Sequence, residues 1–496
     1  MKKTHRNLTT GLPAILLLAS LALFGNAIAQ PDSLWARAYG DNQVDICTDA
    51  ILTTRNEHIL VGAKRTRDPN DILVVKSDER GDTIWTRLFS FNQIHVYQVP
   101  GGVTELISGN YLLAGFVGDI DNEAYYGFAY CLSPEGDSLW WLGIDHGSIE
   151  EFFDCVATRD GGAVLAGHSY ALNPNGAWLA KVTGDGEVEW EMSYGDPEAP
   201  GFEEIWSVVQ TEDGGYAIAG NTTSYAGARQ DFFLLKTDSL GNEEWRNHYG
   251  SEANETSYGM TETPDRGFLL VGYSTLLDNG DFYYVRVDSE GEMMWERLLE
   301  ANYGNYCWSA EVVENGFILA GEGETIQRNR GGEEFYIVRT DTEGEPIWTT
   351  FYGARFSAEE CRSVMVHSDG SYSFAGNTDR LGEGQDFWLV RTGVDPANSV
   401  VTLLDPAFPS QFVVEAPYPN PFNSSVRLSY SLPNPSQTSI RIYNQLGHQV
   451  AELYNGRLEA GQHTLNWNGY GQQSGAYFIK VDASAKTMTQ KVMLVK

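Results

Sequence analysis

The chain of 496 residues has few basic side chains for its size, with 33 Lys+Arg against 67 Asp+Glu and a formal net charge of −34. The deficit lies in the middle of the chain. Residues 417–496 hold 7 Lys+Arg and 3 Asp+Glu, whereas residues 30–416 carry a net charge of −41. Because so acidic a surface repels phosphate backbones and anionic headgroups, the composition argues against a nucleic-acid partner. It favours simple solubility, or recognition of cations and of basic or neutral ligands.

Cysteine is scarce as well, with five residues scattered along the chain: Cys47, Cys131, Cys155, Cys307 and Cys361. This number and spacing exclude a disulfide-scaffolded mini-domain and a CxxC metal site. An odd count leaves at least one thiol unpaired or in an intermolecular bond.

Long apolar runs are missing after residue 29, so no later segment reaches the roughly 20 residues that a membrane helix needs. Before that point, a basic start precedes an apolar run over residues 12–24 and three small residues at 27–29. This pattern predicts a signal peptide over residues 1–29, cut between Ala29 and Gln30. The chain also lacks a Walker loop, a GxSxG elbow and an HExxH motif.

A repeat is the main feature that the sequence does have. Its clearest marker is a tryptophan that recurs at intervals of 50, 55, 50, 55, 50 and 53 residues, as Trp35, Trp85, Trp140, Trp190, Trp245, Trp295 and Trp348. A period near 50 with short apolar runs and glycine turns is typical of a radial array of small β-sheets.

Residues 205–249 show what one unit contains. Four strand-like segments, namely Ile205–Thr211, Tyr216–Gly220, Phe232–Lys236 and the segment around Trp245, are separated by turns. The alternation and the turn chemistry predict a four-stranded antiparallel meander.

The two ends of the array are offset by one strand. The second and third segments occur seven times each, but the tryptophan segment follows only six of them, and the remaining copy, at Trp35, precedes the first unit. If this strand completes the last sheet, the chain ends close a ring without a free edge. We therefore predict an all-β fold with a seven-bladed β-propeller over residues 30–392, in which the tryptophans pack between blades.

The residue pattern of the repeat resembles that of bacterial β-propeller repeats. These contain Trp, then Tyr-Gly, an acidic residue, Asp-Gly-Gly, and two strands that end in Gly and in Lys or Arg. The matching residues in one unit are Tyr249, Gly250, Glu203, Asp213, Gly214, Gly215, Gly220, Asp231 and Lys236. This resemblance covers residues 35–391 and implies the fold, but no particular activity.

A different composition follows a predicted linker over residues 393–416. Residues 417–496 contain short alternating runs separated by glycine and proline turns, which predict a small immunoglobulin-like β-sandwich.

The tail also resembles the type A sorting domain of the type IX secretion pathway of Bacteroidota and their relatives. The matching residues include Pro419, Asn420, Pro421, Phe422, Asn423 and Gly475 and a basic C-terminal end. The resemblance implies passage through the periplasm, interaction with the type IX secretion machinery, and delivery to the medium or the outer cell surface. An ordinary immunoglobulin-like binding module is the alternative.

An acidic position recurs just before the first strand of each unit, at Asp45, Gln98, Glu150, Glu203, Glu255, Gly304 and Glu359. These carboxylates could accept backbone N–H bonds at a turn, or together hold a cation such as calcium. Arginines on neighbouring loops could pair with them: Arg65, Arg67, Arg229, Arg328 and Arg380. Asp119, Asp121 and Asn122 are a weaker hint of calcium, and no other cofactor is expected.

Departures from the repeat indicate where a single site could lie. The richest sector holds the candidate ligand-binding residues His95, Tyr97, His146, Glu150, Glu151, His168 and Tyr170. Histidine beside carboxylate suits acid–base chemistry, whereas loop aromatics suit stacking on a sugar ring. Packing of the loops is the third interpretation. Cys47 and Cys361 hold equivalent positions in the first and last units, which ring closure would bring together. A disulfide between them is therefore one of the possibilities that the sequence allows.

These observations favour a non-enzymatic exported propeller that binds a glycan or a surface protein. The alternatives are a secreted polysaccharide lyase or hydrolase with its site in the histidine sector, and a structural surface-layer or adhesion component.

Overall fold

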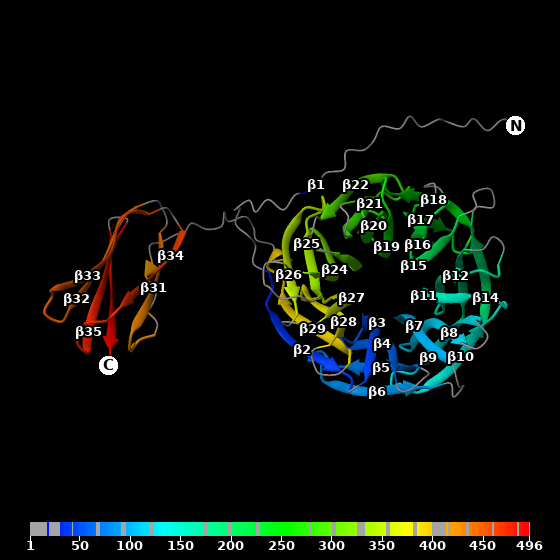
Figure 1. The fold of residues 1–496 in the computed structure, drawn as a ribbon, viewed down its shortest axis with the longest axis horizontal. Helices are drawn as coiled ribbons and strands as arrows, with labels where there is room; N and C mark the ends of the chain where they lie inside the picture. Colours follow the sequence, from blue (N-terminus) through cyan, green and yellow to red (C-terminus); the bar gives the residue numbers. More distant parts are fainter. Residues whose placement is uncertain are drawn as a thin grey trace, which may run out of the picture. The chain divides into compact units, whose positions relative to one another are not determined.

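The computed structural model divides the chain into two compact units, residues 1–399 and residues 400–496. It describes residues 17–18, 30–41, 43–65, 70–90, 96–119, 124–172, 176–195, 201–224, 229–276, 280–299, 304–324, 333–353, 358–379, 384–398, 413–414, 417, 419–432, 436–458, 461–483 and 486–495. The first unit is a ring of small sheets around a central opening (Figure 1).

Sheets 1 to 3 are consecutive meanders in which each strand pairs with the next. Sheet 1 comprises β3 (Val44–Leu52), β4 (His58–Arg65), β5 (Asn70–Ser77) and β6 (Thr83–Phe89). Sheet 2 comprises β7 (Val96–Glu105), β8 (Tyr111–Asp119), β9 (Ala124–Leu132) and β10 (Ser138–Ile144). Sheet 3 comprises β11 (Glu150–Ala157), β12 (Ala163–Ser169), β13 (Gly176–Val182) and β14 (Val188–Tyr194).

Sheets 4 to 6 repeat this arrangement. Sheet 4 comprises β15 (Glu203–Gln210), β16 (Tyr216–Thr222), β17 (Asp231–Thr237) and β18 (Glu243–Tyr249). Sheet 5 comprises β19 (Glu255–Glu262), β20 (Phe268–Ser274), β21 (Asp281–Val287) and β22 (Met293–Leu299), and the short β1 (Leu17–Leu18) pairs in parallel with β22. Sheet 6 comprises β23 (Tyr306–Val313), β24 (Gly316–Glu324), β25 (Glu333–Thr340) and β26 (Pro346–Tyr352).

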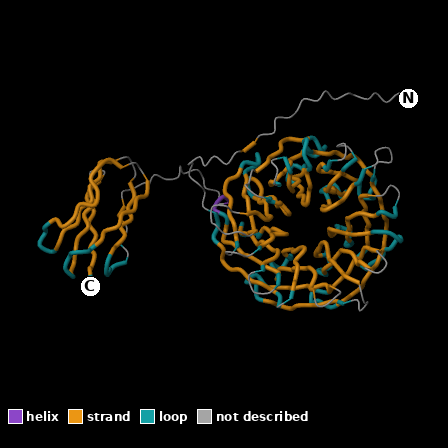
Figure 2. The backbone as a smooth tube through the Cα atoms, in the orientation of Figure 1, coloured by secondary structure: helices purple, strands orange, loops and turns teal. Residues whose placement is uncertain are grey.

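Sheet 7 is assembled from both ends of the first unit. It comprises β27 (Glu359–Val366), β28 (Ser371–Thr378), β29 (Asp386–Val394) and, as its outer strand, β2 (Ser33–Tyr39). Trp35 is opposite Arg391 in this pairing. Each first strand also contacts the first strand of the next sheet, and β27 contacts β3. The described residues thus form an all-β, propeller-like fold (Figure 2).

Burial follows the position of each strand within its sheet. The second and third strands are buried along their whole length in sheet 4, where β16 and β17 have no exposed residue, whereas β18 is mostly exposed until Tyr249. The middle strands have neighbouring sheets on both faces, so apolar residues are favoured at every position along them. The outer strands face water on one side, so exposed residues occur among the more buried ones.

The repeated tryptophans join neighbouring sheets. In six cases the indole packs on the glycine that closes the turn between the third and fourth strands of the next sheet, in the pairs Trp35–Gly81, Trp85–Gly136, Trp140–Gly186, Trp190–Gly241, Trp245–Gly291 and Trp295–Gly344. These glycines have φ between +78° and +88°. A side chain there would be strained and would strike the indole ring, so the turn and the packing both require glycine.

The seventh tryptophan contacts the end of the last sheet. Trp348 Nε1 donates to Asp395 Oδ1 at 3.1 Å, and Arg339 Nε lies 3.1 Å from Asp395 Oδ2. The Arg339 and Asp395 side chains are both fully buried. The turn η2 (Pro396–Asn398) follows, so the chain leaves sheet 7 later than residue 393, where the sequence analysis began the linker.

Except in sheet 2, where the equivalent residue is Cys131, a basic residue near the end of the third strand binds the hairpin between the first two strands of its own sheet. Lys236 Nζ lies 2.9 Å from Asp213 Oδ2 and 3.0 Å from Glu244 Oε2, and Lys181 makes the equivalent contacts with Asp160 and Glu189. The repeated Asp-Gly-Gly and the terminal Lys or Arg are therefore parts of one ion-paired structure.

Each first strand carries a β-bulge at the same place, which leaves one residue without a partner on the second strand. The residues concerned are Thr48, Gly101, Phe153, Trp206, Tyr258, Trp308 and Arg362. In four sheets the side chain after the bulge then binds the next sheet. Asp49 Oδ2 accepts from Val103 N at 2.9 Å, and Asp154 Oδ2 accepts from Val208 N at 2.8 Å.

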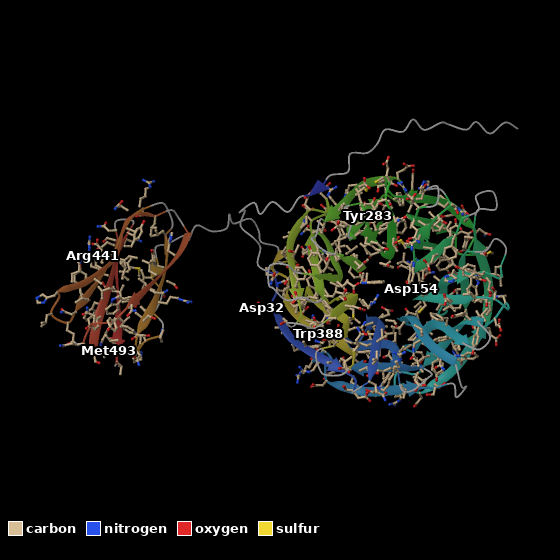
Figure 3. The ribbon with its side chains drawn as sticks, in the orientation of Figure 1. Asp32, Asp154, Tyr283, Trp388, Arg441 and Met493 are labelled. Carbon is tan, nitrogen blue, oxygen red and sulfur yellow. The ribbon has the colours of Figure 1, made fainter. Side chains whose placement is uncertain are left out.

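Serines perform the same task at two other junctions. Ser309 Oγ accepts from Val364 N at 3.2 Å, and Ser363 Oγ accepts from Ala50 N at 3.0 Å. Burial raises the pKa of Asp49 to about 6 and that of Asp154 to about 7. Figure 3 shows Asp154 beside the central opening.

The second unit contains two sheets with a common core. One comprises β30 (Val413–Val414), β31 (Ser425–Leu432) and β34 (Gly461–Asn468), and the other β32 (Ser436–Asn444), β33 (Gln449–Leu458), β35 (Gly475–Ala483) and β36 (Lys486–Leu494). Leu428 and Trp467 from the first sheet belong to the same buried cluster as Ile442 and Ile479 from the second. This is a sandwich architecture.

The predicted sorting motif lies along the last strand of this unit. Asn420 Oδ1 accepts from Met493 N at 2.8 Å, and Phe422 N donates to Met493 O at 2.8 Å. Phe422 is buried against Trp467, with ring centroids 5.3 Å apart, and Gly475 begins β35 opposite Leu494. The motif therefore helps to close the sandwich.

The buried Arg339–Asp395 pair gives a stability prediction. Asp395→Asn removes a buried carboxylate that pairs with Arg339, so we expect a loss of about 3–5 kcal/mol in the free energy of unfolding in urea. The matched control is Glu212→Gln, because Glu212 and Arg266 form an ion pair with side chains 62% and 63% exposed. That change should cost no more than about 1 kcal/mol. Equal losses in the two variants would contradict the assignment.

Asp154 gives a prediction about pH. With a pKa of about 7 in the folded state and about 3.9 when unfolded, Asp154 binds an extra proton on folding between pH 4 and 7. Its contribution to stability is therefore present at low pH and lost as pH rises through 7. Asp154→Asn removes this dependence, so the unfolding free energy of the variant relative to wild type should increase from pH 4.5 to 8 by on the order of 2–4 kcal/mol.

Asp213→Asn is the control for this titration. Hydrogen bonds from Thr211, Lys236 and Gly215, together with the Lys236 charge, outweigh the effect of burial and lower the pKa of Asp213 to about 2. The stability that Asp213 contributes is lost only below about pH 4. The difference between this variant and wild type should stay constant from pH 4.5 to 8. A constant difference for Asp154→Asn would contradict the raised pKa.

Candidate functional site

The seven bulge residues line a central cavity of about 380 Å³, together with neighbouring residues of six of the seven first strands and Phe116 of β8. A bulge redirects a side chain out of the regular pleat, and here it directs the side chains towards the ring centre. Each sheet therefore contributes to the cavity the bulge residue of its first strand, which has no partner on the second strand.

Five aromatic rings form a continuous wall on one side of this cavity. We call Phe116, Phe153, Trp206, Tyr258 and Trp308 the aromatic arc. Phe153 stacks on Trp206 with centroids 4.4 Å apart, and Tyr258 stacks on Trp308 at 4.0 Å. Edge contacts join Phe116 to Phe153 at 6.3 Å and Trp206 to Tyr258 at 5.5 Å.

Arg362 ends the aromatic arc. Its guanidinium lies 3.8 Å from the Trp308 ring centroid, and Nη2 is 2.7 Å from Glu360 Oε2. Stacking and ion pairing together fix the planar group. The arc is thus a rigid apolar surface with one cation at its end.

The opposite side of the cavity is made of small residues. Sheets 1 and 2 contribute Thr48 and Gly101 at the bulge position, and Ile46, which also lines the cavity, is 37% exposed. A Cβ at Gly101 would lie 2.6 Å from Phe152 O and Phe153 Cα. Glycine is needed here because β7 and β11 approach closely, and the result is an asymmetric cavity.

Acidic groups of raised pKa accompany the aromatic arc. Glu311 lines the cavity, and burial raises its pKa to about 7, the value that burial also gives Asp154. Near neutral pH such carboxyls can either donate or accept a hydrogen bond.

Carboxylates and one histidine lie on the first two strands of sheets 3, 4 and 6, outside the lining of the cavity. In sheet 3, Glu151 Oε2 lies 3.1 Å from His168 Nε2. In sheet 4, burial raises the pKa of Glu204 in spite of the nearby His168. In sheet 6, burial and the Glu360 charge raise the pKa of Glu322 to about 7. These groups lie on strands next to the aromatic arc.

The structure brings three of the predicted site residues together. His168, Glu151 and Tyr170 form one cluster, in which the His168 and Tyr170 rings meet edge to face at 5.2 Å. Tyr170 in turn stacks on Phe202 at 5.3 Å, and Phe202 contacts His168 at 5.7 Å. The imidazole, only 4% exposed, is therefore covered by aromatic rings.

The other predicted residues lie elsewhere or are not fully described. His146 Nε2 is 3.3 Å from Glu191 Oε2 and its ring meets Trp178 at 5.7 Å, whereas His168 follows Gly167, the strand partner of Trp178. Successive residues point to opposite faces of a strand, so the two histidines lie on opposite faces of sheet 3. His95 lies outside the described residues, and only the backbone of Tyr97, opposite Gly118, is described.

The acidic position before each first strand has a local environment. Glu255 accepts from Ser251 N, Ser251 Oγ and Ser274 Oγ, while Asp45 accepts from Lys64 Nζ at 2.9 Å. Burial raises the pKa of Glu150, and among the described residues neither of its carboxylate oxygens has a hydrogen-bond partner. In sheet 6 the position is held by Asn305, whose N–H donates to Gly280 O as Glu255 N donates to Gln230 O. The assignment to Gly304 was wrong by one residue, because the loop before β23 differs in length.

The arginines expected to pair with these acids contribute little. Arg65 and Arg229 are exposed, and the Arg229 charge partly offsets the effect of burial, which raises the pKa of Asp231 to about 6. Arg67, Arg328 and Arg380 lie outside the described residues, as do Asp121 and Asn122 of the suggested calcium loop, of which Asp119 ends β8. All five cysteines are buried and free, so Cys47 and Cys361 are not bridged.

The aromatic arc is the feature that the sequence analysis did not identify. A signal for it exists, since Phe153, Trp206, Tyr258 and Trp308 occupy one repeat position, three residues after the acidic one or after Asn305. Trp206 and Trp308 do not belong to the periodic tryptophan series of the outer strands, so the repeat period alone does not mark them. The bulge that turns these side chains inward becomes visible only from strand register.

Comparison with known proteins identifies the tail. Residues 416–496 match the family described as the secretion system C-terminal sorting domain. No curated protein matches the chain. In the part of the chain that the structure describes, no helix is long and apolar enough to cross a membrane.

Several solved structures resemble the chain. A protein of unknown function from Dyadobacter fermentans is 12% identical, with a TM-score of 0.45, over 74% of this chain and 100% of that one. PorZ, a surface component of the type IX secretion system of Porphyromonas gingivalis, is 13% identical, with a TM-score of 0.32, over 89% and 68%. The polysaccharide lyase Uly1 is 11% identical, with a TM-score of 0.44, over 70% and 90%.

The sorting domain gives the destination and the export route of the protein. It implies interaction with the type IX secretion machinery, as the sequence of the tail predicted. The protein is exported through the type IX secretion system to the cell surface or the extracellular space.

Proposed function

We propose that sheets 1 to 7 form a closed seven-bladed β-propeller and that the exported protein binds a neutral carbohydrate in its central cavity. The pairing of β2 with β29 and the contact of β27 with β3 support closure. The observation that carries the binding proposal is the aromatic arc, which lines the cavity from five neighbouring sheets.

The chemistry of the cavity suits a carbohydrate. Aromatic surfaces bury the C–H faces of sugar rings, and a few fixed polar groups can bind hydroxyls. Glu311 and Arg362 supply such groups at the cavity wall. A volume of about 380 Å³ is at the lower end of the roughly 300–1,000 Å³ of small-molecule sites, which suits a chain end or a short branch. The acidic body disfavours a polyanion.

Binding is favoured over catalysis by the position of the histidine cluster. His168 does not line the central cavity, and Tyr170 and Phe202 cover it. An acid–base residue needs to reach the proton that it transfers. The aromatic arc, by contrast, lines the cavity.

The binding proposal is tested with substitutions in the aromatic arc. We expect the exported chain to retain at least one member of a panel of neutral polysaccharides, and Tyr258→Leu to weaken binding about 10-fold or more in isothermal titration calorimetry. Trp141→Leu is the matched control, because Trp141 is 40% exposed and does not line the cavity. Circular dichroism and thermal unfolding check that both variants are folded. Equal affinity in wild type and Tyr258→Leu would contradict the proposal.

Cleavage of a polysaccharide is the second candidate function. It is favoured by the 3.1 Å contact of His168 with Glu151, next to Glu204, whose pKa burial raises. The same panel distinguishes the two functions, because soluble products are measured together with retention. We expect retention without product release. Products that form with wild type and disappear in His168→Gln would establish catalysis and overturn the binding-only function.

A further inference from the structure

We propose that Glu322, Glu333 and Glu360 bind a divalent cation, with Ca²⁺ as the best fit, at the junction of sheets 6 and 7. One carboxylate oxygen of each residue lies within 4.8 Å of the others. Ca²⁺ binds oxygen ligands at about 2.3–2.6 Å, so a single ion between the three can touch all of them. This site is separate from the carbohydrate proposal, since none of the three residues lines the central cavity.

Three strands bring the carboxylates together. Glu322 lies in β24, Glu333 begins β25 next to it, and Glu360 lies in β27 of the following sheet. The equivalent position on the second strand is occupied by His168 in sheet 3, Asn221 in sheet 4 and Asn377 in sheet 7. Each of these residues pairs with the second residue of the first strand in its sheet, and Glu322 pairs in the equivalent way with Tyr306. A carboxylate here is therefore particular to sheet 6.

A buried oxygen points independently to a ligand. Glu322 is only 7% exposed, and among the described residues its Oε2 has no hydrogen-bond partner. A buried carboxylate oxygen normally has a donor or a metal, because removing it from water is costly. A cation held between Glu322, Glu333 and Glu360 would satisfy this oxygen.

Glu360 is held in place by partners of its own. Arg362 Nη2 lies 2.7 Å from Glu360 Oε2, and Asn377 Nδ2 lies 3.4 Å from the same oxygen. These contacts fix the Glu360 carboxylate near Glu322 and Glu333.

The environment favours Ca²⁺ over Mg²⁺. Ca²⁺ takes six to eight oxygen ligands in flexible geometry, whereas Mg²⁺ needs near-ideal octahedral geometry. Three carboxylates from separate strands do not impose an octahedron, and Glu333 is exposed, so water has access to the remaining positions. Extracellular Ca²⁺-binding modules have a Kd of about 10⁻⁴–10⁻³ M, and we expect a value in this range here.

Terbium luminescence tests the site in the whole chain after removal of metal with a chelator. Tb³⁺ replaces Ca²⁺ at oxygen sites, and the Trp308 indole lies beside Glu322, so excitation of tryptophan should sensitise the bound ion. We expect Ca²⁺ to displace the signal and to raise the thermal unfolding midpoint. Glu322→Gln and Glu360→Gln should weaken Ca²⁺ binding about 10-fold or more, the effect of losing roughly 1.4 kcal/mol.

Two further variants keep the test decisive. Glu333→Gln alters an exposed ligand and should weaken binding without affecting the fold, even where Glu322→Gln disturbs it. Glu343→Gln, an exposed carboxylate in the turn before β26, should bind as wild type does and measures the background of the acidic surface. No Ca²⁺-dependent change up to about 5 mM, above the weakest Kd expected for such a site, would overturn the proposal. So would equal binding in Glu333→Gln and Glu343→Gln.

Discussion

The free edge of each first strand is the constraint on which the first unit depends. A first strand pairs on one side only, so the N–H groups on its other side need acceptors that no strand supplies. At four junctions the residue after the bulge meets this need from the previous sheet, as Asp49 does for Val103 and Ser363 for Ala50. Where that residue is Gly102, Thr104 Oγ1 accepts from Ala157 N instead. One side chain therefore both satisfies an edge and fixes the spacing between two sheets.

The same constraint explains why the fold could be predicted from the sequence. Neighbouring sheets need similar contacts at each junction, and a similar contact calls for the same residue type each time. Trp245 on Gly291 is such a contact between sheets, and Lys236 with Asp213 is a repeated contact within one sheet. The offset of Trp35 predicted its pairing with the strand of Arg391, because an unpaired outer edge would be exposed. The loop before β23 broke the period, and there the alignment failed by one residue.

The cavity could not be predicted in the same way, because its residues are those that the junctions do not need. Asp154 supplies the hydrogen bond to the next sheet, so the side chain at position 153 is not needed as a hydrogen-bond acceptor between the sheets. This position is accordingly threonine, glycine, aromatic or arginine in different sheets, as at Thr48, Gly101 and Arg362. A search for histidines and loop carboxylates led to His168, which is covered. Only the register of strands distinguishes Phe153, which faces the centre, from Phe152, which stacks on Trp178.

Freedom at the bulge position also separates the chemistry of the cavity from the stability of the ring. The hydrogen bonds between sheets are accepted by side chains other than the bulge residue, such as Asp154 and Thr104, so a change from one aromatic ring to another alters the cavity wall and leaves those bonds in place. Gly101 is the exception, since a side chain there would strike the backbone of β11. The small side of the cavity is thus fixed by packing, whereas the aromatic side can vary. A ring of this kind can acquire a new ligand through residues such as Tyr258 without acquiring a new fold.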